Sequence, residues 1–215
     1  MSRTKAQIDI AAKNRTLAAE SRGVLRGRGI FTVNLIGSPG CGKTSLLEAT
    51  ARHFGERMAV IEGDIKTDLD AKRIEAAGIQ AVQIETGGAC HLDAAQVAGA
   101  IARLDLESVE ILFIENVGNL VCPSSVDLGE DVKVAVVSLP EGDEKPAKYP
   151  ALFVRAGAVV INKTDLLPYL DYSIERAAAD CRKLSNKAVV MPLSCRTGEG
   201  MDMWISYLEG AIASR

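Results

Sequence analysis

The 215 residues of this chain suit one α/β domain with an extension better than two full domains. Apolar residues make up 47% and charged residues 25%, the balance of a globular protein with a buried core. The formal net charge of −3 argues against nucleic acid as the main partner. Since the sequence lacks both a membrane-spanning apolar stretch and a secretory signal, we expect a soluble, cytoplasmic chain with no membrane partner.

Residues 1–29 predict a basic helical arm, and we place the main domain at residues 30–215. Residues 4–21 contain good helix formers with an irregular amphipathic pattern. The arm holds seven Lys or Arg against two acidic residues, so it could dock on an acidic partner, a membrane or RNA. A solvated helix face is the favoured interpretation. Three glycines predict a hinge into the domain: Gly23, Gly27 and Gly29.

Seven short, β-branched apolar runs recur along the rest of the chain, and most are separated by segments with helical character. Continuous apolar strands that alternate with helices predict an α/β fold, a mainly parallel sheet covered by helices on both faces. The predicted strands are 31–36, 58–61, 81–84, 109–114, 132–137, 158–161 and 188–191. The predicted helices are 44–54, 68–77, 92–104, 173–184 and 201–213.

The segment after the first predicted strand matches the G-x-x-x-x-G-K-[ST] pattern of phosphate-binding loops and precedes a predicted helix. Its glycines let successive backbone N–H groups point at phosphate oxygens, and the helix N-terminus adds its positive dipole end. The ammonium group of Lys43 would lie near the β- and γ-phosphates, and the Thr44 hydroxyl would bind Mg²⁺. The predicted nucleotide-binding residues here are Gly37, Ser38, Pro39, Gly40, Cys41, Gly42, Lys43, Thr44 and Ser45.

Two predicted strand ends offer carboxylates for Mg²⁺. Glu115 follows one buried strand directly, and Asp64 closely follows another. Ligands of open α/β sheets bind at the carboxyl ends of the strands, and Mg²⁺ takes one or two carboxylates besides phosphate and water. We expect Thr44, Asp64 and Glu115 to bind Mg²⁺ and, together with Lys43, to carry catalysis. Solvated loop acids are the alternative, and Asp68 is a weaker candidate.

A second motif, N-K-x-D, follows a buried predicted strand about 120 residues after the phosphate loop. Asp165 can accept two hydrogen bonds from guanine, and adenine lacks that pair of donors, so the motif favours GTP over ATP. Asn162 would hold the loop, and the stem of Lys163 would lie over the base. Ser194 and Cys195 resemble the backbone loop that GTPases use beside the base.

Three soft or borderline ligands remain: Cys90 and His91 after a glycine-rich turn at the start of a helix, and Cys122 in a later loop. Neighbouring parallel strands would bring both turns to one edge of the sheet. Two thiolates and an imidazole suit Zn²⁺ or Ni²⁺, and a two-fold dimer would complete the site. By spacing alone, the alternative that these are two unrelated buried cysteines and a loop histidine is as good as a metal site. Glu115 lies only seven residues before Cys122. A loop that is ordered by GTP and released after hydrolysis would therefore move a metal ligand directly.

Several long segments together resemble HypB, the family of hydrogenase nickel-incorporation GTPases. The similarity runs from about residue 5 to the C-terminus. It implies a SIMIBI-class P-loop GTPase that forms a homodimer with GTP and helps deliver nickel to the [NiFe]-hydrogenase large-subunit precursor, with a HypA-type nickel chaperone as partner. The segments that carry it are 63–67, 85–94, 113–123, 127–130, 141–146, 148–150 and 162–170.

The resemblance also implies roles for particular residues. Cys90, His91 and Cys122 match the family's metal site at the dimer interface, and the basic arm becomes a candidate for docking HypA. Lys145 and Lys148 could reach across the dimer. The sequence lacks an N-terminal Cys-rich motif and, with two histidines, a His-rich tract, so we expect neither a separate high-affinity nickel site nor nickel storage.

Two alternative functions can be distinguished from this one by their cysteine patterns. A urease-type nickel-insertion GTPase is expected to show Cys-Pro-His, but Ser124 follows Cys122-Pro123 here. A regulatory GTPase switch without a second metal would use its cysteines only for packing. No glutamine or arginine is evident as a water-positioning or charge-stabilising residue, so GTP hydrolysis to GDP and phosphate should be slow.

Overall fold

The computed structural model describes residues 5–64 and 69–215, with the backbone alone at residues 5–8, 64 and 69–72. Seven strands form one sheet in the order β3-β2-β4-β1-β5-β6-β7, and every neighbouring pair is parallel. This confirms the predicted α/β class. The strands are β1 Phe31–Gly37, β2 Met58–Asp64, β3 Gln80–Glu85, β4 Ile111–Glu115, β5 Val132–Ser138, β6 Ala158–Asn162 and β7 Val189–Pro192.

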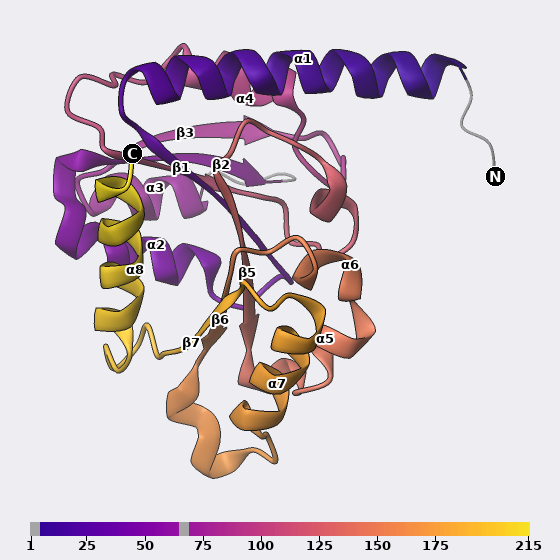
Figure 1. Ribbon diagram of the computed structural model, residues 1–215. Coiled ribbons are helices and arrows are strands. Elements are labelled where there is room, and N and C mark those ends of the chain that lie inside the picture. The colour runs from indigo at the N-terminus through magenta and orange to yellow at the C-terminus, as the bar shows by residue number, and fades with distance from the viewer. Residues whose placement is uncertain (1–4, 65–68) are drawn as a thin grey trace.

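Helices cover both faces of the sheet, also as predicted (Figure 1). Helices α2, α3 and α8 pack on one face, and α1, α4, α6 and α7 pack on the other. In the part of the chain that the structure describes, no helix is both long and apolar enough to cross a membrane. The helices are α1 Lys5–Gly27, α2 Lys43–Phe54, α3 Leu69–Ala76, α4 Ala94–Ile101, α5 Lys145–Lys148, α6 Pro150–Phe153, α7 Ile174–Leu184 and α8 Met201–Ala213, with short 3-10 turns η1 Gly55–Arg57, η2 Cys122–Ser125, η3 Leu139–Glu141 and η4 Thr164–Tyr169.

The central strand β4 shows why its apolar residues form a continuous run. Successive side chains of a strand point to opposite faces, so a strand covered on both sides must be apolar at every position. Phe113 packs with α2 and α8, whereas Leu112 and Ile114 pack with α4 on the other face. The run ends at Glu115, a buried carboxylate at the carboxyl edge of the sheet.

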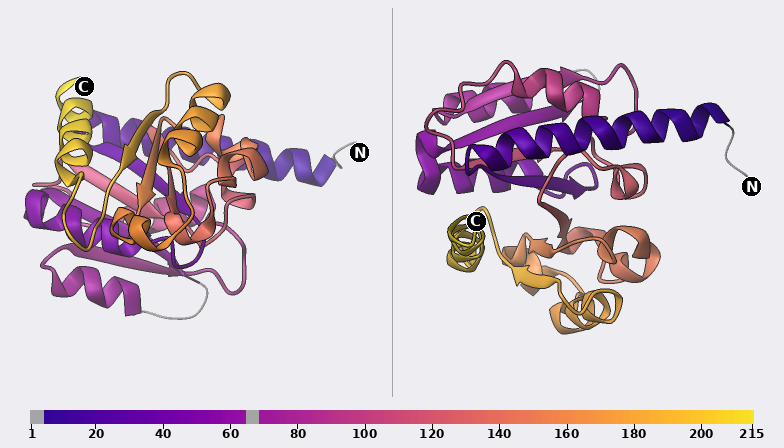
Figure 2. Two further views of the ribbon diagram at one scale, coloured as in Figure 1. Left: turned by 90° about the horizontal axis from the view of Figure 1, so that it is seen from below. Right: turned by 45° about the horizontal axis from the view of Figure 1, so that its top comes forward.

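The hinge predicted at Gly23 is wrong, because α1 continues through this residue to Gly27 (Figures 1 and 2). Ala18 and Leu25 of the same helix are buried, and Leu25 joins the core beside α4. This packing outweighs the cost of a glycine inside a helix, about 1 kcal/mol relative to alanine. Whether residues 1–29 and 30–215 act as separate units stays a prediction.

The helix predicted at 92–104 is shorter and begins at Ala94. Asp93 ends the preceding loop, because its side chain accepts a hydrogen bond from the Gln96 N–H at 2.8 Å and forms a capping box. Cys90 and His91 therefore lie in the loop before α4 and do not begin the helix. Their strand β3 is also separated from β4 by β2, so the two strands are not direct neighbours.

Candidate functional site

The phosphate-loop motif connects β1 to α2, as its sequence predicts. β1 ends at Gly37, and α2 begins at Lys43 after Gly42, whose φ of 97° is left-handed. Lys43 and Thr44, the first residues of α2, are buried with 7% of their surface exposed. The loop therefore lies at the positive end of the α2 dipole, where an anion is stabilised.

Three of the four predicted catalytic residues meet at the end of β4. The Thr44 hydroxyl lies 3.1 and 3.2 Å from the two Glu115 carboxylate oxygens and donates to that carboxylate. The Lys43 ammonium is 3.8 Å from Glu115 Oε1. The parallel pairing of β1 with β4 sets this geometry, because Glu115 is in register with Leu35, two residues before the loop begins. A hydroxyl and a carboxylate at this edge are suitable oxygen ligands for Mg²⁺.

The fourth predicted residue, Asp64, is the last residue of β2, in register with Glu85 of β3. Its side chain is not among the described ones, so its metal role stays a prediction, and Asp68 lies outside the described residues altogether. The structure adds Glu62, which was not predicted. Glu62 is buried and in register with Glu115. β2 runs three residues beyond its predicted end and therefore includes position 62. The signal available in the sequence was the carboxylate that directly follows the apolar run.

These strand ends and the phosphate loop line a cavity of about 450 Å³, within the size range of small-molecule sites. Arg73 of α3 lines it too, and its guanidinium pairs with Glu48 at 2.8 Å. An adjoining cavity of about 360 Å³ leads to the N-K-x-D segment. The two cavities share the lining residues Gly42, Ser45 and Lys163, so they lie side by side along the phosphate loop.

The N-K-x-D segment is hydrogen-bonded directly to the phosphate loop. The Asn162 amide donates to the Cys41 carbonyl at 3.1 Å, and the Lys163 ammonium donates to the Gly40 carbonyl at 2.6 Å. Lys163 has φ of 64°, the one positive value outside glycine in the described ranges. The Asn162 side-chain oxygen accepts from the Lys163 N–H at 2.7 Å and supports this backbone conformation.

The predicted loop beside the base meets the same segment. The Ser194 hydroxyl donates to Asp165 Oδ1 at 2.6 Å, and the Cys195 N–H donates to the Asn162 side-chain oxygen at 3.3 Å. Burial raises the pKa of both Cys41 and Cys195 to about 11, so these thiols stay protonated at neutral pH. They therefore suit packing better than metal binding.

The loops after β3 and β4 bring Cys90 and Cys122 together. Cys90 is exposed, Cys122 begins η2, and a hydrogen bond between the thiols raises the pKa of Cys90. Asn119 joins the loops through its amide, which donates to the Cys90 carbonyl at 3.3 Å. His91 Nδ1 lies 2.8 Å from the Leu92 carbonyl, which favours Nε2 as the ligating nitrogen.

Among the described residues, no three His, Cys, Asp or Glu side chains are grouped closely enough to hold a metal ion. One chain therefore brings two thiols together but does not assemble the full predicted set with His91.

The comparisons with known proteins agree on one family. Residues 31–192 match the model of the family described as "CobW/HypB/UreG, nucleotide-binding domain". The hydrogenase maturation factor HypB of Azotobacter vinelandii is 51% identical over 203 residues, which cover 94% of this chain and 67% of that protein. Its Escherichia coli K12 counterpart is 48% identical over 205 residues, covering 94% and 71%.

A solved structure agrees with these sequence relatives. The crystal structure of HypB from Helicobacter pylori in complex with nickel is 37% identical and superposes with a TM-score of 0.90. The match covers 94% of this chain and 96% of that chain.

Gly118 gives a test of the contact between the β4 loop and the phosphate loop. A Cβ at Gly118 would lie 2.8 Å from Pro39 Cγ and 3.0 Å from Pro39 N, so Gly118→Ala must displace backbone. We expect weaker binding of a non-hydrolysable GTP analogue, by about 1–3 kcal/mol, the usual cost of overpacking, measured by calorimetry.

The matched control is Gly99→Ala on α4, where an added Cβ meets nothing within 4 Å. That variant should bind the analogue normally and unfold at a slightly higher temperature, since alanine favours a helix over glycine. Unchanged nucleotide affinity in Gly118→Ala would show that the two loops do not need this close approach.

Proposed function

The chain belongs to the HypB family of hydrogenase maturation factors, within the CobW/HypB/UreG group, and from this premise we propose a Mg²⁺-dependent GTPase that delivers nickel to a hydrogenase precursor. One observation carries the nucleotide part. The guanine-type motif donates two hydrogen bonds to the phosphate loop, from Asn162 and Lys163, and the two segments line adjoining cavities. This arrangement would hold the base and the phosphates of one nucleotide at a fixed separation.

At the phosphate end, Lys43 and the loop N–H groups would bind the β- and γ-phosphates. The buried carboxylates Glu62 and Glu115 lie side by side in the β2–β4 register, and a cation stabilises such a pair. Thr44, Glu115 and Asp64 are the proposed Mg²⁺ ligands. The bound ion would neutralise charge on the phosphates during hydrolysis.

At the base end, Asp165 would select guanine. The Ser194 hydroxyl holds Asp165 Oδ1, which fixes the carboxylate toward the cavity that Asn162, Lys163 and Cys195 also line. Two charge-assisted hydrogen bonds from guanine would then satisfy the carboxylate. Adenine would leave it without those donors, at a cost of several kcal/mol.

The nickel part of the proposal rests on the donor set after β3 and β4. Cys90 and Cys122 are close enough to share a hydrogen bond, both thiols are at least partly exposed, and His91 offers Nε2. These soft and borderline donors fit Ni²⁺ or Zn²⁺. Because the described residues of one chain contain no group of three such donors, we propose that a second copy, bound in the GTP state, completes the site.

Partners and compartment follow the family premise and stay proposals: a HypA-type nickel chaperone, the large-subunit precursor of a [NiFe]-hydrogenase, and the cytoplasm. Lys145 and Lys148 are weaker candidates for contacts across the dimer. Each is paired within its own chain, to Glu141 at 3.3 Å and to Glu144 at 2.8 Å. Reaching a partner subunit would require these ion pairs to open.

Removal of the phosphate-loop ammonium tests the hydrolase. Lys43→Ala should lower GTP turnover by at least about 100-fold, since a positioned charge on the reacting phosphates contributes roughly 3–4 kcal/mol. Phosphate release under saturating Mg²⁺ measures it. The control is Lys183→Ala on α7, whose exposed ammonium pairs with Asp180 and should leave turnover unchanged. Undiminished hydrolysis by Lys43→Ala would rule out the proposed site.

Neutralising the proposed guanine receptor tests base selection. Asp165→Asn should reduce the preference for GTP over ATP by about 10- to 100-fold, because it weakens hydrogen bonds to a charged acceptor. Competition between the two nucleotides for a fluorescent GTP analogue measures the ratio. Asp180→Asn, the same change on the surface of α7, should keep the wild-type ratio. A preference that survives Asp165→Asn would assign base recognition elsewhere.

Loss of one thiol tests the metal site. Cys122→Ala should remove most Ni²⁺ and Zn²⁺ bound in equilibrium dialysis while GTP turnover persists, because the thiol lies outside the proposed hydrolytic residues. Cys181→Ala is the control, since Cys181 is buried on α7 and burial raises its pKa to about 11. Equal metal content in both variants would favour a GTPase switch without this metal site.

A further inference from the structure

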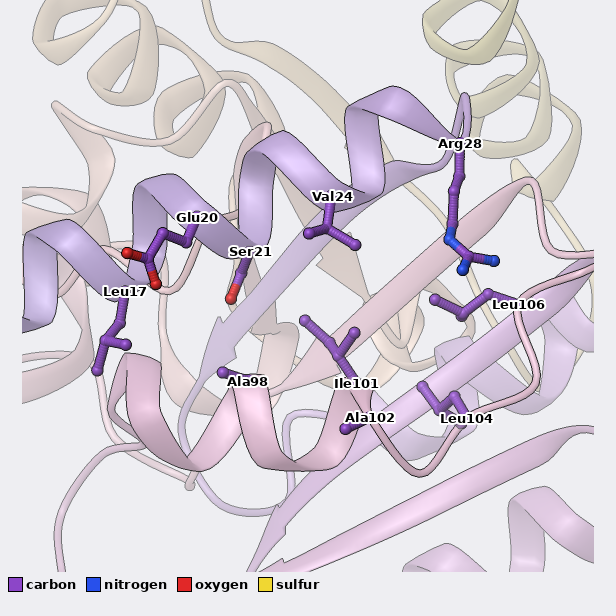
Figure 3. Close-up of a pocket in the computed structure, with 10 residues that line it drawn as sticks. All are labelled: Leu17, Glu20, Ser21, Val24, Arg28, Ala98, Ile101, Ala102, Leu104 and Leu106. Atoms are coloured by element: carbon purple, nitrogen blue, oxygen red, sulfur yellow. The ribbon is translucent and has the colours of Figure 1, made fainter.

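Helix α1 is fixed along α4, next to the loops that carry the Cys/His donors. Figure 3 shows Leu17, Ser21 and Val24 of α1 directed toward Ala98 and Ile101 of α4. Figures 1 and 2 agree that the two helices lie side by side and that the first turns of α1 extend beyond α4. The position of α1 relative to α4 is therefore set by side-chain packing.

One side chain of α1 hydrogen-bonds to both metal-donor segments. The Asn14 amide nitrogen donates to the Asp127 carbonyl at 2.7 Å, and its amide oxygen accepts from the Ala94 N–H at 2.8 Å. Ala94 is the first residue of α4, three positions after His91, and Asp127 is five positions after Cys122. Asn14 thus bridges the segment of Cys90 and His91 to the segment of Cys122.

The chemistry of this bridge requires a carboxamide. The first N–H groups of a helix lack partners within it, and Asn14 satisfies the Ala94 N–H while Asp93 caps that of Gln96. At the same time, the Asn14 amide nitrogen donates to the Asp127 carbonyl. Aspartate could accept from Ala94 but could not donate when ionised, and alanine could do neither.

Short, internally bonded connections link both ends of the bridge to the metal donors. On the α4 side, Leu92 is fully buried, and its N–H donates to the Asn116 side chain at 3.2 Å. On the other side, η2 runs from Cys122 to Ser125, and the Val126 N–H donates to the Pro123 carbonyl at 3.3 Å. A shift at Ala94 or Asp127 would therefore be passed to the thiols.

Helix α1 also contacts the Cys122 segment directly, at Asp127 and Gly129. Arg22 donates to Asp127 Oδ1 at 2.5 Å, and a Cβ at Gly129 would lie 2.8 Å from the Ala18 carbonyl of α1. With Asn119 joining the loops near the sulfur atoms, the two segments are connected at the donor end and again at Asn14. Two connection points fix the distance between the segments and also their relative orientation.

We infer that Asn14 is a positioning residue for the Cys/His site, an inference that rests on the proposed metal binding. Its carboxamide sets the spacing of the Cys90–His91 and Cys122 segments and so preorganises the thiols for Ni²⁺. Groups that orient metal ligands from outside the coordination sphere typically contribute 10- to 100-fold in metal affinity.

The test compares Asn14→Ala and Asn14→Asp with the wild-type chain, bound to a GTP analogue and titrated with Ni²⁺ against a competing chelator. Both variants should bind Ni²⁺ about 10-fold more weakly, and the thiolate-to-nickel charge-transfer band should change, because the donors are less well oriented. Asn14→Asp should be at least as weak as Asn14→Ala, since its carboxylate would face the Asp127 carbonyl.

Two controls separate positioning from folding. Alanine favours a helix more than asparagine does, so Asn14→Ala should not unwind α1, and metal-free GTP turnover should stay within about twofold of wild type. Thr16→Ala, a change on the exposed side of the same helix, should leave both nickel affinity and the absorption band unchanged. A merely structural role would lower the unfolding temperature without changing affinity or spectrum.

The outcomes distinguish the two proposals. If wild-type protein binds Ni²⁺ and both Asn14 variants bind it equally well with the same spectrum, the role of Asn14 is overturned and the metal site stands. If wild-type protein fails to bind Ni²⁺, the proposed metal function falls, and the role of Asn14 with it.

Discussion

The parallel direction of all seven strands is the constraint on which the candidate site depends. It puts the carboxyl end of every strand at one edge of the sheet, and the loops with chemical groups leave from that edge. Glu115 reaches Thr44 because β4 pairs with β1 in register, and Glu62 lies beside Glu115 because β2 pairs with β4. An antiparallel strand at any of these positions would send its loop to the opposite edge.

The loop between Glu115 and Cys122 connects the two proposed sites by direct contacts. It begins at the carboxylate that meets Thr44, passes Pro39 at Gly118, and reaches the Cys90 carbonyl through Asn119. Such contiguous packing offers a route by which a nucleotide-dependent rearrangement would reach the thiols. Coupling in the thermodynamic sense would further require different metal affinities in the GDP and GTP states.

Local sequence patterns predicted the fold and the place of the candidate site in it, whereas features set by distant contacts were not predicted. The strands and the phosphate loop follow from apolar runs and glycines in a fixed order. The continuity of α1 through Gly23 depends on packing with α4, about seventy residues away, which no local pattern reports. Glu62 was missed because β2 extends past its apolar run, and the bridge at Asn14 joins segments 80 and 113 residues away.

The contacts of α1 also indicate which part of the basic segment is available to a partner. Arg22 pairs with Asp127, and Arg26 pairs with Asp131, so part of the positive charge in the second half of the helix is balanced within the chain. Ahead of Asn14 the helix extends past α4, and Ile10 is 70% exposed there. Exposed charge attracts an acidic surface, and exposed apolar area adds affinity once the surfaces meet. On the proposal that this arm docks an acidic partner, the exposed Lys13 and Arg15 and the exposed Ile10 would supply the contacts, adjacent to the residue that bridges both metal-donor segments.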